Sequence, residues 1–182
     1  MSPPDNRRPV RVLSQDDSRF GWLTVRRRRL TACGVPPVGP IQHVFEWFDS
    51  YGAVAPTTGE RFLLALPSLR SDMCQLFIDA LAQAFPESMN LLLLENSGAQ
   101  TAQGLRWPEN VRCVWLPPYC PELNPIERVW RDVKDDVAWH QFPDIDAQQH
   151  EVGDLLCAYH ATALQSLTGY AYLVEAINAL AL

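Results

Sequence analysis

One stretch decides how this 182-residue chain folds: Leu116-Pro-Pro-Tyr-Cys-Pro-Glu-Leu-Asn-Pro-Ile-Glu-Arg-Val-Trp-Arg-Asp-Val-Lys134. Its first half is rich in proline, which lacks the backbone N–H that helices and sheets need. Asn124-Pro125 then predicts a helix start, with Asn as the cap and Pro at the first helical position. The apolar face of this helix has helical spacing and consists of Ile126, Val129, Trp130, Val133 and Val137.

Two short apolar runs before this stretch predict strands. Val111–Leu116 is ended by Pro117-Pro118. The continuous run Leu91–Leu94 is too short for a helix and fits a fully buried central strand. Before them, Ser71 is a good N-cap for an amphipathic helix that Pro86 ends.

The N-terminal third predicts strands joined by turns. Val10–Leu13 is a short strand that runs into the acidic pair Asp16-Asp17, and Phe20–Val25 fits as its hairpin partner. Ile41–Tyr51 and Glu60–Leu66 predict an antiparallel hairpin, because a Pro-Thr-Thr-Gly turn lies between them.

The order of the elements predicts the fold class. Three strands, a helix, a strand, a short loop or helix, a strand and further helices indicate an α/β fold, with a mixed sheet flanked by helices. We expect residues 1–9 to form a flexible arm and residues 10–182 to form a single domain. Its tail, from about Asp146, predicts one or two helices interrupted near Thr168-Gly169.

Composition disfavours several classes of protein. No run approaches the ~18 apolar residues of a membrane span and no signal sequence is evident, so we expect a cytoplasmic protein without a membrane partner. The five cysteines have no CxxC spacing, which disfavours a zinc site or a disulfide framework. The net charge of −6 disfavours simple nucleic-acid affinity. The exception is a basic run that is either a DNA contact or a solvated face, namely Arg26, Arg27, Arg28 and Arg29.

Three carboxylates occupy places typical of a divalent metal site. Asp16 follows the first strand, Glu95 follows the buried strand, and Glu127 lies in the first turn of the helix. Carboxylates suit Mg²⁺, and two such ions about 4 Å apart can stabilise both oxygens of a phosphodiester displacement. Each residue also has a plainer interpretation. Asp16 and Glu95 suit solvated turns, and Glu127 suits a capping box.

The Leu116–Lys134 stretch closely resembles a motif of insertion-sequence transposases of the mariner-like superfamily. In that family a Pro-Tyr-Ser-Pro-Glu-Leu-Asn-Pro-Ile-Glu run leads into the helix that bears the third catalytic acid. Cys120 stands in place of the serine, and the matching acid is Glu127 rather than Glu122. The resemblance covers roughly residues 10–140.

Two further segments resemble the other motifs of this family. Gln15–Gly21 is similar to the first motif, which places the catalytic acid at Asp16 and an accompanying acid at Asp17. Leu91–Gln100 aligns with the second motif, in which a buried strand ends in the second acid. That position is occupied by Glu95.

The resemblance implies a ribonuclease H-like fold and the Asp-Asp-Glu chemistry of DNA strand transfer. It implies that two Mg²⁺ or Mn²⁺ ions are held by three catalytic acids, namely Asp16, Glu95 and Glu127. The residues that it places around these acids are Asp17, Asn96 and Asn124. The implied partners are DNA, as transposon ends and target, and a second copy of the chain in a homodimer. The implied location is the bacterial nucleoid.

The second motif departs from the family pattern. Where the family has Asp, Trp and His, this chain has Glu95, Ala99 and Gln100. The extra methylene of glutamate moves the carboxylate by about 1.5 Å, and a misplacement of about 1 Å can cost ~10²-fold in rate. We therefore expect weakened strand transfer unless the backbone compensates. The alternative is a catalytically inactive remnant that binds DNA or a partner transposase.

The helix-turn-helix region that recognises transposon ends in this family has no room before Asp16. We expect either the second reading frame of a split transposase or a truncated remnant. The first case needs a separate helix-turn-helix protein from the upstream reading frame. A ribonuclease H-type nuclease acting on RNA or hybrids would share the fold, but the run that ends in Glu127 speaks against it.

Overall fold

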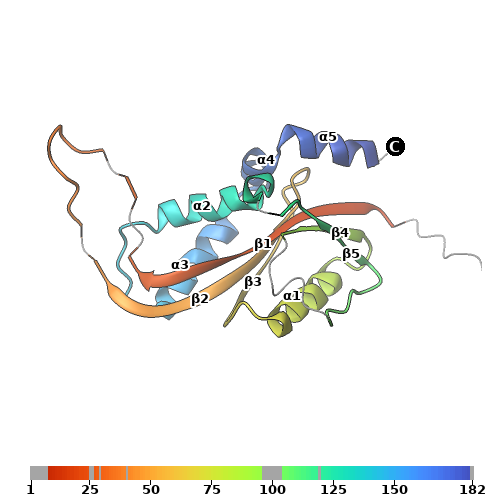
Figure 1. Cartoon of the computed structure of the whole chain (residues 1–182), viewed down its shortest axis with the longest axis horizontal. Helices are drawn as coiled ribbons and strands as arrows, with labels where there is room; N and C mark the ends of the chain where they lie inside the picture. The colour runs from red at the N-terminus through yellow and green to blue at the C-terminus, as the bar shows by residue number, and fades with distance from the viewer. Residues whose placement is uncertain are drawn as a thin grey trace, which may run out of the picture.

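One long strand, β1 (Val10–Leu23), runs through the middle of the sheet. The computed structural model describes residues 8–180 except 25, 26, 29, 40, 96–103 and 119. The other strands are β2 (His43–Val54), β3 (Arg61–Leu66), β4 (Met89–Leu94) and β5 (Val111–Trp115). They form a mixed sheet in the order β3-β2-β1-β4-β5, in which β2 is antiparallel to β1 and β3, and β4 is parallel to β1 and β5 (Figure 1).

The polar middle of β1 stays extended. The expected hairpin between Val10–Leu13 and Phe20–Val25 is wrong, because β1 is a single strand of 14 residues. It continues through the acidic pair because β2 pairs along it, with Asp16 opposite Gly52. The acidic pair therefore lies inside the sheet, and its two side chains point to opposite faces.

The remaining strands follow expectation. The hairpin of β2 and β3 is confirmed, and β4 is a largely buried strand between β1 and β5. In the parallel pair of β1 and β4, Ser14 lies opposite Leu93. Continuing this register by two residues brings Glu95, directly after β4, level with Asp16. The sheet itself thus brings the first two expected acids together.

Helices cover both faces of the sheet (Figure 1). They are α1 (Ser71–Ala84), α2 (Ile126–Asp136), α3 (Ile145–Ala158), α4 (Ala161–Thr168) and α5 (Ala171–Leu180). Helix α1 packs on one face in a core cluster that includes Leu13, whereas α2, α3 and α4 pack on the other with Phe20 and Phe48. None of the helices in the described part of the chain is long and apolar enough to span a bilayer.

Helix α1 begins differently from expectation. Ser71, expected as the N-cap, is the first helical residue, and Arg70 occupies the cap position without a side-chain bond. Asp72 in the first turn forms an ion pair with Arg70 at 3.2 Å and places negative charge where the helix dipole favours it. The helix ends at Ala84, before Pro86, as expected.

The tail forms three helices rather than one or two. The expected break near Gly169 is confirmed, but a second break follows α3. There Arg61 of β3 donates hydrogen bonds to the carbonyl oxygens of Cys157 at 2.6 Å and Tyr159 at 2.7 Å. A side chain from a distant strand therefore satisfies acceptors at the end of the helix, which no local pattern predicts.

Trp130 fixes α2 to the sheet. Its indole is 1% exposed, and a methyl group added at Gly52 of β2 would lie 2.7 Å from this ring. Only glycine leaves room for so close an approach. Because Gly52 is also the cross-strand neighbour of Asp16, this contact sets how far α2 lies from the strand that carries the first acid.

We predict that Gly52→Ala destabilises the domain by about 1–3 kcal/mol, because the added methyl group overpacks the Trp130 ring. Urea denaturation followed by tryptophan fluorescence measures the change. Gly153→Ala is the matched control, since its added methyl group meets nothing within 4 Å and alanine favours the helix α3. An unchanged midpoint for Gly52→Ala would contradict the packing argument.

Candidate active site

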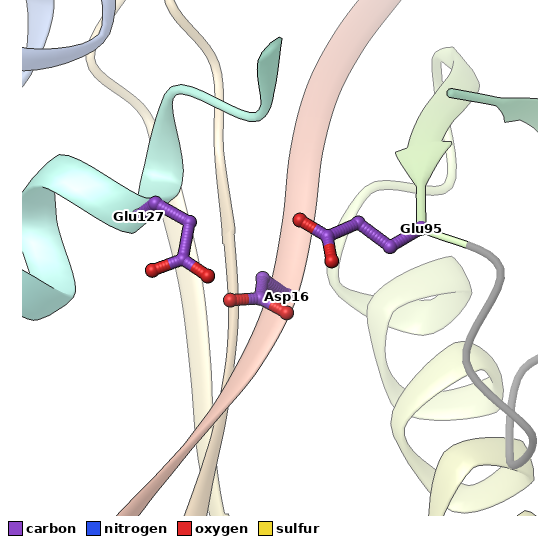
Figure 2. A group of neighbouring side chains, drawn as sticks. All are labelled: Asp16, Glu95 and Glu127. Carbon is purple, nitrogen blue, oxygen red and sulfur yellow. The ribbon is translucent and has the colours of Figure 1, made fainter. Parts of the chain in front are cut away.

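Three carboxylates from distant parts of the chain meet beside α2. Asp16 lies in β1, Glu95 directly follows β4, and Glu127 is in the first turn of α2. One oxygen of each carboxylate lies within 4.8 Å of the others. Figure 2 shows the side chains pointing toward one another, with Asp16 between the two glutamates. The structure thus brings together the three acids selected from the sequence.

Asn124 connects two of the elements that carry these acids. It is fully buried, and its Nδ2 donates to the backbone carbonyl of Gln15 at 2.9 Å and to Oε1 of Glu95 at 3.4 Å. The expectation that the Asn124 side chain caps α2 is wrong, because Pro125 occupies the N-cap position and no side-chain capping bond forms. The amide instead links β1 to the residue after β4.

The plainer interpretations of two acids are wrong. Asp16 is 8% exposed and lies within a strand, not in a solvated turn. A capping box would bind the Glu127 side chain to the backbone N–H of Asn124, but that N–H donates to the carbonyl of Pro121 at 2.9 Å. For Glu95, the turn that could explain it falls in residues 96–98, which lie outside the described residues.

Asp17 faces away from Asp16, because successive strand residues alternate between the two faces. It lies near Asp49, whose carboxylate forms an ion pair with Arg19 at 2.9 Å. Burial and then the charge of Asp49 raise the pKa of Asp17 to about 6. The expected accompanying acid therefore lies on the face covered by α1. Asn96, the other expected neighbour, lies outside the described residues.

The surroundings of Asp16 disfavour the ionised form of its carboxyl group. Burial raises its pKa well above the usual value, and the carboxylates of Asp17, Glu127 and Glu95 raise it further. Burial also raises the pKa of Glu95, although the hydrogen bond from Asn124 opposes this shift. A divalent cation relieves such concentrated negative charge, and carboxylate oxygens are ligands that Mg²⁺ and Mn²⁺ prefer. The residues therefore fit a divalent metal site.

One cation near the acids, Lys134, is not among the expected site residues. It is half-buried on α2, and its Nζ lies 5.5 Å from the centroid of the Phe20 ring. Burial lowers the pKa of Lys134, whereas the charges of Glu127 and Asp16 oppose that shift. The sequence spacing could have indicated Lys134 as a site residue. It follows Glu127 by seven residues, which is two helical turns and therefore the same face of the helix.

The structure describes two of the four arginines of the basic run. Arg27 forms an ion pair with Asp135 of α2, and Arg28 is exposed. Arg26 and Arg29 lie outside the described residues. Helix α2 therefore neutralises part of the positive charge of this run, and contact of the run with DNA stays a prediction.

The fold and the site together define a class of protein. The sheet order β3-β2-β1-β4-β5, antiparallel on one side of β1 and parallel on the other, is the ribonuclease H-like arrangement. Its acids lie on the central strand, after β4, and on the helix that follows β5. Such a site suits metal-dependent phosphodiester chemistry.

The chain belongs to the DDE superfamily endonucleases, because a model of that family matches residues 11–149. It is also 31% identical over 90 residues to "Uncharacterized protein y4pE/y4sA" of Sinorhizobium fredii (strain NBRC 101917 / NGR234). That alignment covers 49% of this chain and 67% of the relative. The expected membership of the Asp-Asp-Glu enzymes is confirmed.

Solved structures of the Mos1 transposase are similar to this fold. The TM-score is 0.66, at 14% identity, for the Mos1 transposase paired-end complex with left transposon end. It is 0.67, at 13% identity, for the Mos1 strand transfer complex. Each match covers 87% of this chain but only 51% and 50% of the Mos1 chains, so this chain spans about half their length. The expected ribonuclease H-like fold in a single domain is confirmed.

We predict that Asp16→Asn raises the Tm of the metal-free protein at pH 7, because it removes a carboxylate whose ionisation the fold opposes. The folded-state pKa is raised, so this group costs stability once the pH rises above its unfolded-state pKa of about 4. The gain should therefore disappear at lower pH, where Asp16 is protonated in both states. Melting curves in EDTA measure this gain in stability, and each kcal/mol should raise the Tm by about 2–4 °C.

Adding Mn²⁺ should reverse this order, raising the Tm of the wild type while leaving Asp16→Asn nearly unchanged. Asp154→Asn is the control, because Asp154 is exposed on α3 and should behave like the wild type in both conditions. A wild-type Tm that does not respond to Mn²⁺ would count against a metal site at these acids.

Proposed function

We propose that this chain is the catalytic domain of a DNA transposase, which cuts a phosphodiester at a transposon end and joins the freed 3′-hydroxyl to target DNA. The observation that carries the proposal is the convergence of Asp16, Glu95 and Glu127 within 4.8 Å in a DDE superfamily chain. Neither the helices nor the strands by themselves indicate this function. Three separate elements supply the acids, and each one is positioned by buried contacts.

The proposed cofactors are two Mg²⁺ or Mn²⁺ ions held by Asp16, Glu95 and Glu127. Mos1 paired-end complexes have been solved with Mn and with Mg. Bound divalent ions supply an activated attacking oxygen and neutralise the charge that develops on the phosphate. These three carboxylates would hold the ions, and that of Asp16 lies between those of the two glutamates (Figure 2).

The chain itself positions the reacting groups. Asn124 holds the carboxylate of Glu95 against β1, and thus offsets the freedom that the longer side chain brings. Lys134 holds a positive charge near Glu127 and Asp16, where a phosphate oxygen of bound DNA would need a counter-charge. Catalysis of this type rests on positioning and charge neutralisation, without a covalent enzyme intermediate.

DNA is the proposed partner, as both transposon ends and target. The Mos1 structures include complexes with a transposon end, and this chain spans about half of the Mos1 length. We propose that it acts as a homodimer at the bacterial nucleoid, and that a separate helix-turn-helix protein from an upstream reading frame recognises the ends. Residues 10–182 form the catalytic domain in this proposal, with contributions to DNA binding from Arg26, Arg27, Arg28 and Arg29.

A catalytically inactive remnant is the alternative, and the observation that favours it is Glu95 in place of aspartate. Against it, the Glu95 carboxylate reaches the same 4.8 Å cluster as the other two acids. The extra methylene of Glu95 therefore does not keep its carboxylate away from the other two acids.

We predict that the wild-type protein nicks supercoiled plasmid DNA in Mn²⁺, and that Asp16→Asn or Glu127→Gln lowers the rate by at least about 10²-fold, because each removes a proposed metal ligand. Gel separation of supercoiled and open-circular DNA measures the rate. Asp154→Asn on α3 is the matched control and should retain the wild-type rate. Wild-type activity that survives the loss of either acid would overturn the proposal.

The variant Glu95→Asp separates the two candidate functions. If Glu95 already reaches the metal position, shortening it withdraws the carboxylate by about 1.5 Å and lowers the nicking rate by about 10-fold or more. A faster Glu95→Asp protein would instead show that the natural glutamate impairs the site. No nicking by either protein, together with retained DNA binding, would favour the remnant.

A further inference from the structure

The outer face of α2 carries arginines beside the proposed catalytic acid. Arg128 follows Glu127 directly, and Arg131 lies four residues after Glu127, about 6 Å further along the helix axis. Both arginines are exposed. Helix α2 therefore presents Glu127, the third of the proposed catalytic acids, close to two cations, although the chain as a whole has a net charge of −6.

Two grooves meet at Arg131. One has a volume of about 430 Å³ and is lined by Pro121, Glu122, Glu127, Arg128, Arg131 and Tyr170. The other has a volume of about 720 Å³ and is lined by Arg27, Arg28, Arg131, Asp135, Ala138 and Trp139. Since Arg131 lines both, they adjoin at this residue, and we call the pair the α2 groove. It begins at Glu127 and ends at Trp139.

The charges that line the α2 groove are mostly positive and unneutralised. Asp135 is paired with Arg27. In the described part of the chain, none of Arg28, Arg128 and Arg131 takes part in a salt bridge. The remaining acid besides Glu127 is Glu122, at the opposite end from Trp139. The groove therefore suits an anion that passes Arg131.

Arg128 is held in place before any ligand arrives. Its guanidinium lies 5.2 Å from the centroid of the Tyr170 ring and donates a hydrogen bond to the carbonyl of Leu167 at 3.3 Å. An arginine restrained in this way loses little side-chain entropy when it binds a phosphate. Arg131, by contrast, is exposed and available to a ligand.

We propose that the α2 groove holds the phosphodiester backbone of the DNA strand next to the scissile phosphate, with Arg131 as the principal phosphate contact. This inference rests on the proposed function, because the groove starts at Glu127, where the reacting phosphate would sit. The axial distance from Glu127 to Arg131 is about 6 Å, so Arg131 can reach a phosphate close to the reacting one. In this proposal the main cationic contact with DNA lies on α2, and not in the basic run that begins at Arg26.

Binding of a fluorescein-labelled DNA duplex in EDTA tests this assignment without catalysis. Arg131→Ala should weaken binding by about 5- to 10-fold at low salt and reduce the slope of log K against log salt by about one, because one phosphate contact is lost. Arg131→Lys should restore most of the slope, and Glu122→Gln should tighten binding. Arg70→Ala is the matched control, since Arg70 is exposed beside α1 on the other face of the sheet.

Equal affinity and equal salt slope for Arg131→Ala and the wild type would overturn the inference. So would an Arg70→Ala protein that binds as weakly as Arg131→Ala, because binding would then depend on overall charge only. These results are distinguishable from failure of the proposed function. Wild-type nicking in Mn²⁺ with no effect of Arg131→Ala on binding removes only the groove, whereas weakened binding without any wild-type nicking removes only the catalysis.

Discussion

The contact between the Trp130 ring and Gly52 is the constraint on which the site depends. Gly52 pairs with Asp16 across the sheet, and Trp130 lies one helical turn after Glu127. The same contact therefore sets the positions of the first and third acids relative to each other. Because the ring is buried and a side chain at Gly52 would collide with it, the close approach of α2 to β2 at this point requires glycine. The position of Glu127 therefore follows from the core packing of α2.

The acids that this packing brings together oppose folding in the absence of a cation. Burial and mutual repulsion disfavour ionised Asp16, and Asn124 supplies a hydrogen bond to only one of the three carboxylates, that of Glu95. The free energy of this arrangement is offset elsewhere, by the apolar clusters on both faces of the sheet. Stability and function therefore place opposite demands on the same residues, as is common where titratable groups converge at a functional site.

Much of the site could be predicted from the sequence, and the failures have physical causes. The apolar run of β4 and the helix after Asn124 depend on local pattern, so Glu95 and Glu127 were placed correctly at the end of a strand and in the first turn of a helix. The uninterrupted course of β1 through Asp16 depends on pairing with β2, which no local signal reports. An asparagine such as Asn124 can cap a helix or form a buried cross-link between strands. Only the fold shows which groups its side chain binds. Lys134 shares a helix face with Glu127, but its nearness to Asp16 depends on how α2 packs against β1, which no local signal reports.

The adjacency of Asp16 and Asp17 has a consequence for folding fidelity. In a sheet, a slip of the register by one residue turns every side chain to the opposite face. Such a slip in β1 would exchange the two aspartates, and a carboxylate would still face α2. The chemistry of the acids therefore cannot by itself select the correct alignment of β1. The apolar residues of β1 can, because the slip would move Leu13 and Phe20 out of the core clusters that they join on opposite faces of the sheet. Core packing on both faces thus decides which of two adjacent acids enters the site.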